Sequence, residues 1–101
     1  MRKIIGRRVF DTNTAEHVCD IRCTAYGGDF RWHETGLFRT ASGQWFLAGR
    51  GNAFSMWGRD GVGGQVPGEG IKLISNDEAL VILEAEDMDD VIEEHFEVVE
   101  G

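Results

Sequence analysis

The sequence predicts an α+β fold, in which an antiparallel β-sheet of four to five strands precedes two acidic C-terminal α-helices. The strands are two hairpins plus a short strand. Three observations predict this fold: aromatic-rich runs around a Ser42-Gly43 turn, an alternating run before them, and a helix-capping signal at Ser75. With 101 residues and 42% hydrophobic content, the chain fits a single globular domain over residues 1–101.

The hairpin over residues 32–49 is the predicted core. Gly43 tolerates the positive φ that a tight turn needs, and the residues on either side suit a pleated, half-buried surface. Trp45, Phe38 and Phe46 lie within it.

The first 24 residues predict a second hairpin. Residues 2–10 form its first strand, residues 11–14 its turn and residues 16–24 its second strand, with His17, Cys19, Ile21 and Cys23 on one face. A helix over residues 14–22 is the alternative. Within one strand, Cys19 and Cys23 would lie about 13 Å apart, too far for a disulfide, so we expect reduced packing residues.

Residues 49–70 hold eight of the fourteen glycines and the single proline, without clear periodicity. They predict a long loop that is functional or mobile. A short strand over residues 71–74 follows. Ser75 and Glu78 then form a capping box for a helix that ends near Glu86, and a second helix begins near Asp87.

Charge is distributed unevenly along the chain. The formal net charge is −8, but residues 75–101 contain eleven Asp and Glu and no Lys or Arg. Such an acidic block repels nucleic acid and suits a basic protein surface. No apolar run approaches the roughly 20 residues of a membrane span, and none of signal-peptide length follows the start, so we expect no membrane contact and a bacterial cytoplasmic location.

The sequence indicates no catalytic chemistry. No spacing of Cys and His is typical of a zinc site, and no P-loop is present. Cys19 and His17 lack an identifiable third group. We therefore expect a non-enzymatic protein without catalytic residues, metal or cofactor. Direct nucleic-acid binding or a regulatory role through strand arginines beside aromatic residues is the alternative function.

The predicted partner-binding residues form two sets. The first is the acidic helical surface, and the second is a set of glycine-loop residues that we expect to be exposed and to give specificity, since Trp and Arg are frequent interface anchors. The acidic set is Glu84, Glu86, Asp87, Asp89, Asp90, Glu93 and Glu94, and the loop set is Arg50, Asn52, Trp57 and Arg59.

Several segments together resemble a known family. They are Phe10-Asp11-Thr12, Leu37-Phe38-Arg39-Thr40 with Trp45-Phe46-Leu47, the glycine loop with Ser55 and Trp57, and Ile71-Lys72-Leu73-Ile74-Ser75. They resemble a family of small uncharacterised domains carried by bacteria, phages and plasmids. In size and acidity the chain is also similar to anti-CRISPR proteins. That likeness implies an inhibitor that binds the basic surface of a nucleic-acid-handling host protein, such as a CRISPR effector complex.

Overall fold

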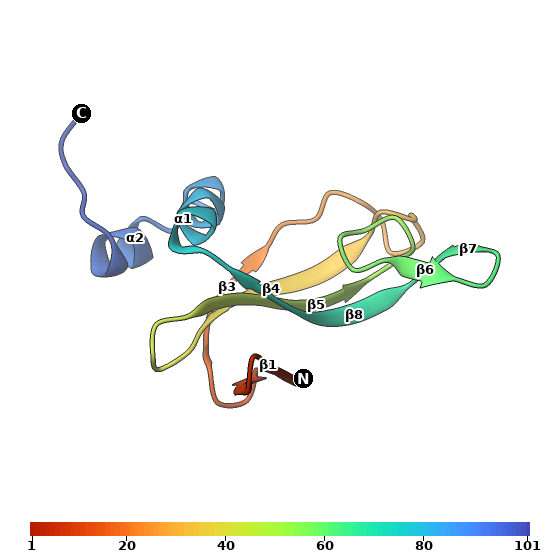
Figure 1. The fold of residues 1–101 in the computed structure, drawn as a ribbon. Helices are drawn as coiled ribbons and strands as arrows, with labels where there is room; N and C mark the ends of the chain where they lie inside the picture. The colour runs from red at the N-terminus through yellow and green to blue at the C-terminus, as the bar shows by residue number, and fades with distance from the viewer.

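The computed structural model describes residues 1–101 and confirms the α+β class. A four-stranded antiparallel sheet has the order β3-β4-β5-β8, and two two-stranded ribbons, β1-β2 and β6-β7, extend from it (Figure 1). The elements are β1 (Arg2–Ile5), β2 (Arg8–Asp11), β3 (Glu16–Ile21), β4 (His33–Arg39), β5 (Trp45–Gly51), β6 (Arg59–Gly61), β7 (Gly64–Val66), β8 (Gly68–Ile74), α1 (Asn76–Ala85) and α2 (Asp89–His95).

The central β4-β5 hairpin has the predicted position. Arg39 pairs with Trp45, and Gly43 adopts a φ of 92° in the turn between the strands. Because cross-strand partners share a face, the sheet has two distinct sides. One carries Leu37, Trp45 and Leu47 beneath the helices, and we call it the helix face. The other contacts the β1-β2 ribbon, and we call it the ribbon face.

The helix face holds the larger core. Leu37, Trp45, Leu47 and Ile74 pack there against Ala79 and Leu83 of α1. The α2 helix continues this packing, since the Phe96 ring stacks on Trp45 at a centroid distance of 6.2 Å. Neither helix has the length and apolar character needed to cross a bilayer.

Capping at both ends defines α1. At its start the Ser75 hydroxyl accepts from the Glu78 amide, and the Glu78 carboxylate accepts from the Ser75 amide, so the predicted capping box is confirmed. At its end the Met88 N–H donates to the Leu83 carbonyl (2.9 Å) and the Asp87 N–H to the Glu84 carbonyl (3.2 Å). This is a Schellman motif with Asp87 at the left-handed position, φ 56°, usually taken by glycine. The second helix therefore begins at Asp89, two residues later than predicted.

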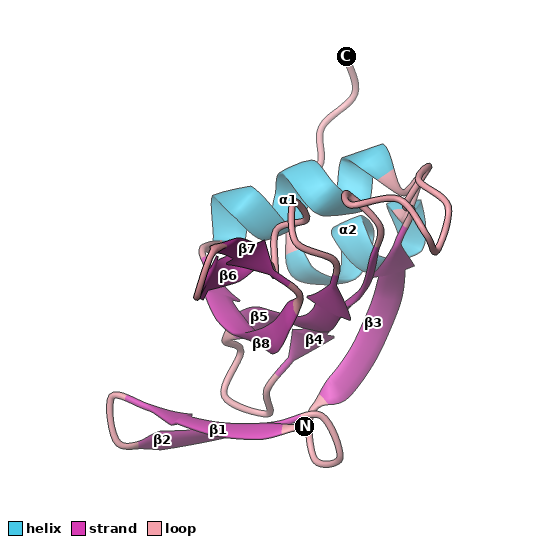
Figure 2. Cartoon of the chain, turned by 90° about the vertical axis from the view of Figure 1, so that its right-hand side faces the viewer, coloured by secondary structure: helices cyan, strands magenta, loops and turns pink.

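The predicted strand over residues 2–10 is wrong. Gly6 and Arg7 have φ values of 58° and 68°, so the chain reverses there and β1 pairs with β2. The predicted pairing of residues 2–10 with residues 16–24 is consequently absent, and β3 pairs with β4 instead. The ribbon lies across the sheet from the helices (Figure 2), anchored by Phe10, whose ring meets Phe46 edge-on at 5.7 Å.

The predicted facing of β3 is partly wrong, because the register shifts between His17 and Cys19. Cys19 and Ile21 pack against the helix-face core, as a shared face requires. His17 lies on the ribbon face, where its ring stacks near Phe38 and bonds to Asp20 at 2.8 Å. An inserted residue at Val18 is the physical cause, since a bulge exchanges the faces of the residues before it.

The glycine-rich segment is more regular than predicted. Gly49 and Gly51 belong to β5, Gly68 and Gly70 belong to β8, and the ribbon β6-β7 lies between them. A turn at Val62-Gly63 connects the ribbon, with Gly63 at a φ of 85°. Only residues 52–58 remain as a compact loop.

Candidate functional site

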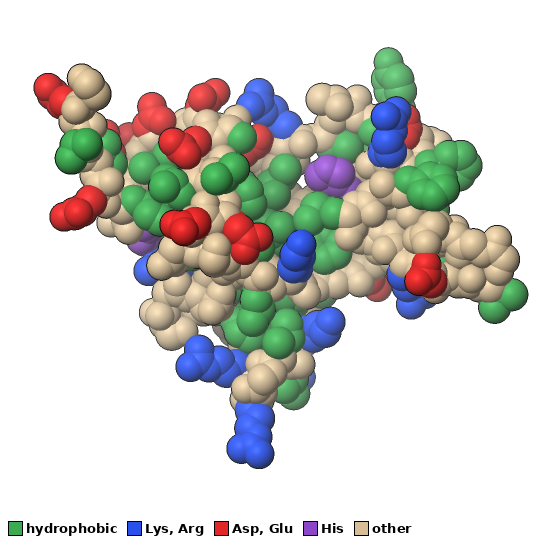
Figure 3. All heavy atoms as spheres, turned by 45° about the horizontal axis from the view of Figure 1, so that its top comes forward, with side chains coloured by type: hydrophobic (Ala, Val, Ile, Leu, Met, Phe, Trp, Pro, Cys, Tyr) green, Lys and Arg blue, Asp and Glu red, His purple; other side chains and the backbone are tan.

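The exposed acidic side chains of the predicted set gather at the helical end of an elongated molecule. Its principal extents are 50 × 34 × 20 Å. Figure 3 shows most of the acidic groups over the helices and most of the basic groups elsewhere. No Lys or Arg follows Lys72 in the chain. Of the predicted acidic set, six side chains belong to exposed residues: Glu84, Asp87, Asp89, Asp90, Glu93 and Glu94.

Glu86 differs from the rest of the acidic set. Its side chain is only 9% exposed, and its carboxylate accepts from the Arg22 backbone N–H at 2.9 Å and from Arg22 Nε at 3.2 Å. Arg22 Nη2 also donates to the Ala85 carbonyl at 2.5 Å. This cluster joins the chain after β3 to the end of α1, so Glu86 holds the helix in place and its charge is compensated.

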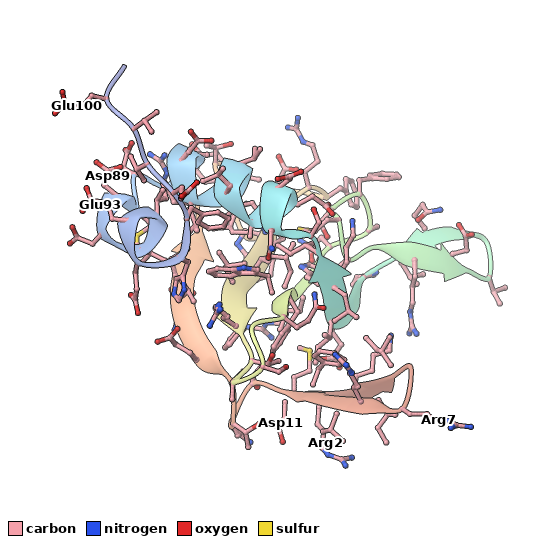
Figure 4. All side chains as sticks on the ribbon, turned by 60° about the vertical axis from the view of Figure 1, so that its left-hand side comes forward. Arg2, Arg7, Asp11, Asp89, Glu93 and Glu100 are labelled. Atoms are coloured by element: carbon pink, nitrogen blue, oxygen red, sulfur yellow. The ribbon has the colours of Figure 1, made fainter.

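The β1-β2 ribbon is the basic counterpart of the helical end. Arg2, Lys3, Arg7 and Arg8 are exposed, and none takes part in an ion pair. Arg2 and Arg7 point away from the sheet on its far side from Asp89 and Glu93 (Figure 4). The fold therefore separates charge of opposite sign across the sheet.

Three of the four predicted loop residues come together. Arg50, Asn52 and Arg59 line a cavity of about 420 Å³ with Trp32 and Glu69, where β5, β6 and β8 meet. Arg50 Nε donates to Glu34 at 3.0 Å, and its guanidinium carbon lies 5.8 Å from the centroid of the Trp32 ring. The sequence alone did not identify Trp32 and Glu69, because only the strand register places Glu69 opposite Arg50.

Asn52 fixes the loop beside this cavity. Its side-chain amide donates to the carbonyls of Gly27 (3.0 Å) and Asp29 (2.7 Å). The Asp29 carboxylate in turn accepts from the Arg31 backbone and side chain, and these hydrogen bonds lower the pKa of Asp29. Asn52 thus holds residues 27–31 in place. Trp32, which lines the cavity, follows them directly in the chain.

Trp57 is half-buried rather than free at the surface. Its Nε1–H donates to the Thr35 hydroxyl at 2.8 Å, and a Cβ at Gly49 would lie 2.7 Å from that nitrogen. His33 Nδ1 lies 2.8 Å from the same hydroxyl. Thr35 is 4% exposed, so the hydrogen bond between its hydroxyl and the indole is buried. The indole therefore covers this glycine-rich end of the sheet.

Cys19 and His17 do not form a catalytic pair. They lie on opposite faces of the sheet because of the bulge at Val18. Burial, followed by the negative charges of Glu86 and Asp20, raises the pKa of the Cys19 thiol, which keeps it protonated at neutral pH. Both cysteines are free, and the structure contains no group of three or more His, Cys, Asp or Glu arranged for a metal ion.

Comparison with known proteins adds no relative from which a function could be inferred. No family model, no curated protein and no solved structure matches the chain. We therefore infer its function from the chemistry of the surfaces described above.

Proposed function

We propose that this protein is a non-enzymatic inhibitor carried by a mobile element, which acts in the bacterial cytoplasm. Its acidic helical end docks on the basic surface of a nucleic-acid-binding protein, such as a CRISPR effector complex, and competes with nucleic acid there. The observation that carries this proposal is the set of exposed acidic groups in the α1-α2 region, a stretch of chain without Lys or Arg, whose one paired neighbour Arg22 compensates only Glu86.

The electrostatics of this end favour docking over simple solvation. Glu84 and Asp87 lie at the C-terminal end of α1, where negative charge opposes the helix dipole. The last turn of α1 contains no basic residue, and the cation that reaches this end from outside the helix, Arg22, is already paired with Glu86. A surface that keeps unfavourable charge is expected where that charge serves binding, and complementary charge mainly speeds association and selects partners.

The test compares two variants with equal loss of charge. In the first, Glu84→Gln, Glu93→Gln and Glu94→Gln neutralise the helical end, and glutamine keeps a helix propensity close to that of glutamate. In the control, Glu16→Gln, Asp20→Asn and Asp60→Asn remove three acids from strands outside the helices.

Each tagged protein is incubated with bacterial lysate, and bound proteins are eluted with a salt gradient. We expect the wild type and the control to retain the same nucleic-acid-binding protein, which elutes at moderate salt because screening weakens exposed charge pairs. The helical variant should release it at lower salt. Equal retention by all three proteins would contradict docking through this end.

The basic ribbon supports a second candidate function, direct binding of nucleic acid. Arg2, Lys3, Arg7 and Arg8 are exposed and unpaired on one protruding ribbon, which could neutralise phosphates. Filter binding at low salt tests it. Saturable binding that is lost in Arg7→Gln/Arg8→Gln would favour the ribbon, whereas absence of binding would exclude it as the functional surface.

A further inference from the structure

The cavity between β5, β6 and β8 has a composition that neither the acidic end nor the basic ribbon explains. Its volume of about 420 Å³ lies within the range of small-molecule sites. It brings together two guanidinium groups, one indole and one carboxylate from segments that are distant in sequence. Such a combination can meet an anionic, a planar and a hydrogen-donating group of one ligand.

The two guanidinium groups of the cavity differ in whether they already have a partner. Arg50 is already paired, because its Nε donates to Glu34 at 3.0 Å and its guanidinium carbon lies 5.8 Å from the centroid of the Trp32 ring. Arg59 forms none of the ion pairs in the structure, so its guanidinium is available to a ligand in the cavity, which Glu69 also lines. An unpaired guanidinium in a fork geometry suits a phosphate group.

The other side chains that line the cavity determine which class of phosphate compound fits. Aromatic rings and guanidinium planes stack with nucleobases, and the Trp32-Arg50 pair offers both. The carboxylate of Glu69 would repel bare phosphate but accept from an amino or hydroxyl group, as carboxylates do with base amines. Gly68 brings β8 close, since a Cβ at that position would collide with the Trp57 carbonyl.

We propose that this cavity binds a nucleotide. Arg59 binds its phosphate, the Trp32-Arg50 wall contacts its base, and Glu69 accepts a hydrogen bond from an amino or hydroxyl group. The phosphate and base belong either to a free mononucleotide or to one residue of a single strand. This site is independent of the acidic helical end.

Binding is tested by NMR titration of the full chain with adenosine monophosphate, with a five-residue oligodeoxyadenylate and with inorganic phosphate. The Trp32 indole N–H signal, assigned with Trp32→Phe, reports on the cavity. We expect saturable shifts of this signal with the mononucleotide, and tighter binding of the oligonucleotide would identify a strand as the source. An unchanged Trp32 signal with both nucleotides would overturn the proposal.

Two exposed positions distinguish a built site from general attraction. Arg59→Gln should weaken nucleotide binding at least tenfold, whereas Lys72→Gln, which removes one charge from β8 on the opposite sheet face, should change it less than twofold. Equal weakening by both variants would overturn the proposal.

Glu69→Gln should weaken nucleotide binding and strengthen that of inorganic phosphate. Strengthening of both ligands alike would show that Glu69 only repels anions, and would overturn the assignment of a nucleotide.

Discussion

Replacing Asp87 with glycine should make the protein more stable. Asp87 ends α1 in the left-handed conformation, φ 56°, at the position where glycine is most frequent. As the residue after the C-cap of α1, it also adds a negative charge at the negative end of the dipole of that helix. Both features cost stability, and glycine removes both while keeping the two hydrogen bonds of the Schellman motif.

The magnitude follows from three terms. Relief of the left-handed conformation contributes roughly 1–2 kcal/mol for an L-residue. Removal of the charge from the helix end contributes about 0.3–1 kcal/mol. The greater freedom of glycine in the unfolded chain subtracts roughly 0.4–1 kcal/mol. We expect a net gain of about 1 kcal/mol, with a rise in Tm of roughly 4–8 °C for a domain of this size.

Urea unfolding followed by circular dichroism measures this gain as a higher midpoint with an unchanged slope. Asp87→Asn is the matched control, because asparagine has the shape of aspartate and removes only the charge, so we expect about half the gain. A loss of stability in Asp87→Gly would refute the assignment of Asp87 as a strained helix end. If Asp87 also serves docking, the stabilised variant should bind its partner less well.

Three further predictions concern other elements. Phe10→Ala should reduce the free energy of unfolding by about 3 kcal/mol and increase hydrogen exchange in β1-β2, because Phe10 is 2% exposed and anchors the ribbon; unchanged exchange would contradict this anchoring. Thr35→Val should cost about 2 kcal/mol in urea unfolding by leaving the Trp57 indole N–H without its acceptor, while Thr35→Ser should not; equal losses would argue against the hydrogen bond. The pKa of Asp29 measured by NMR should lie below its usual value of 3.8, since Arg31 stabilises the carboxylate. The loop over residues 27–31 should then be ordered above pH 3.8 and should loosen as the pH falls through the lowered pKa. A normal pKa would contradict the Asp29–Arg31 contact.

Elements specified by local chemistry were predicted correctly from the sequence. The capping box of Ser75 and Glu78 depends on side chains three residues apart, and the turn at Gly43 depends on one residue that tolerates positive φ. Two helices and a central β4-β5 hairpin follow from such signals. The sequence also placed five exposed acids on the two helices, Glu84, Asp89, Asp90, Glu93 and Glu94, because helical spacing fixes which side chains face solvent.

The predictions are wrong where tertiary contacts or an unusual turn determine the local structure. Arg7 occupies a positive φ that glycine or asparagine usually takes, so the turn between β1 and β2 had only a weak local signal. Within residues 2–10, Ile4 and Phe10 fall on one side of a strand pattern and Ile5 and Val9 on the other, and this conflict was the available evidence of that turn. The bulge at Val18 is set by pairing with β4, and Glu86 loses its exposure through Arg22, a residue 64 positions away. The cavity with Trp32 and Glu69 depends on strand register, which no local pattern specifies.

Competition with nucleic acid tests the proposed docking most directly. A fluorescently labelled nucleic acid is bound to the partner recovered from lysate, and its polarisation is followed as this protein is added. We expect that the wild type and the strand-acid control displace the nucleic acid, and that Glu84→Gln/Glu93→Gln/Glu94→Gln displaces it less well. Displacement by the helical variant that equals that of the wild type would contradict an acidic docking surface.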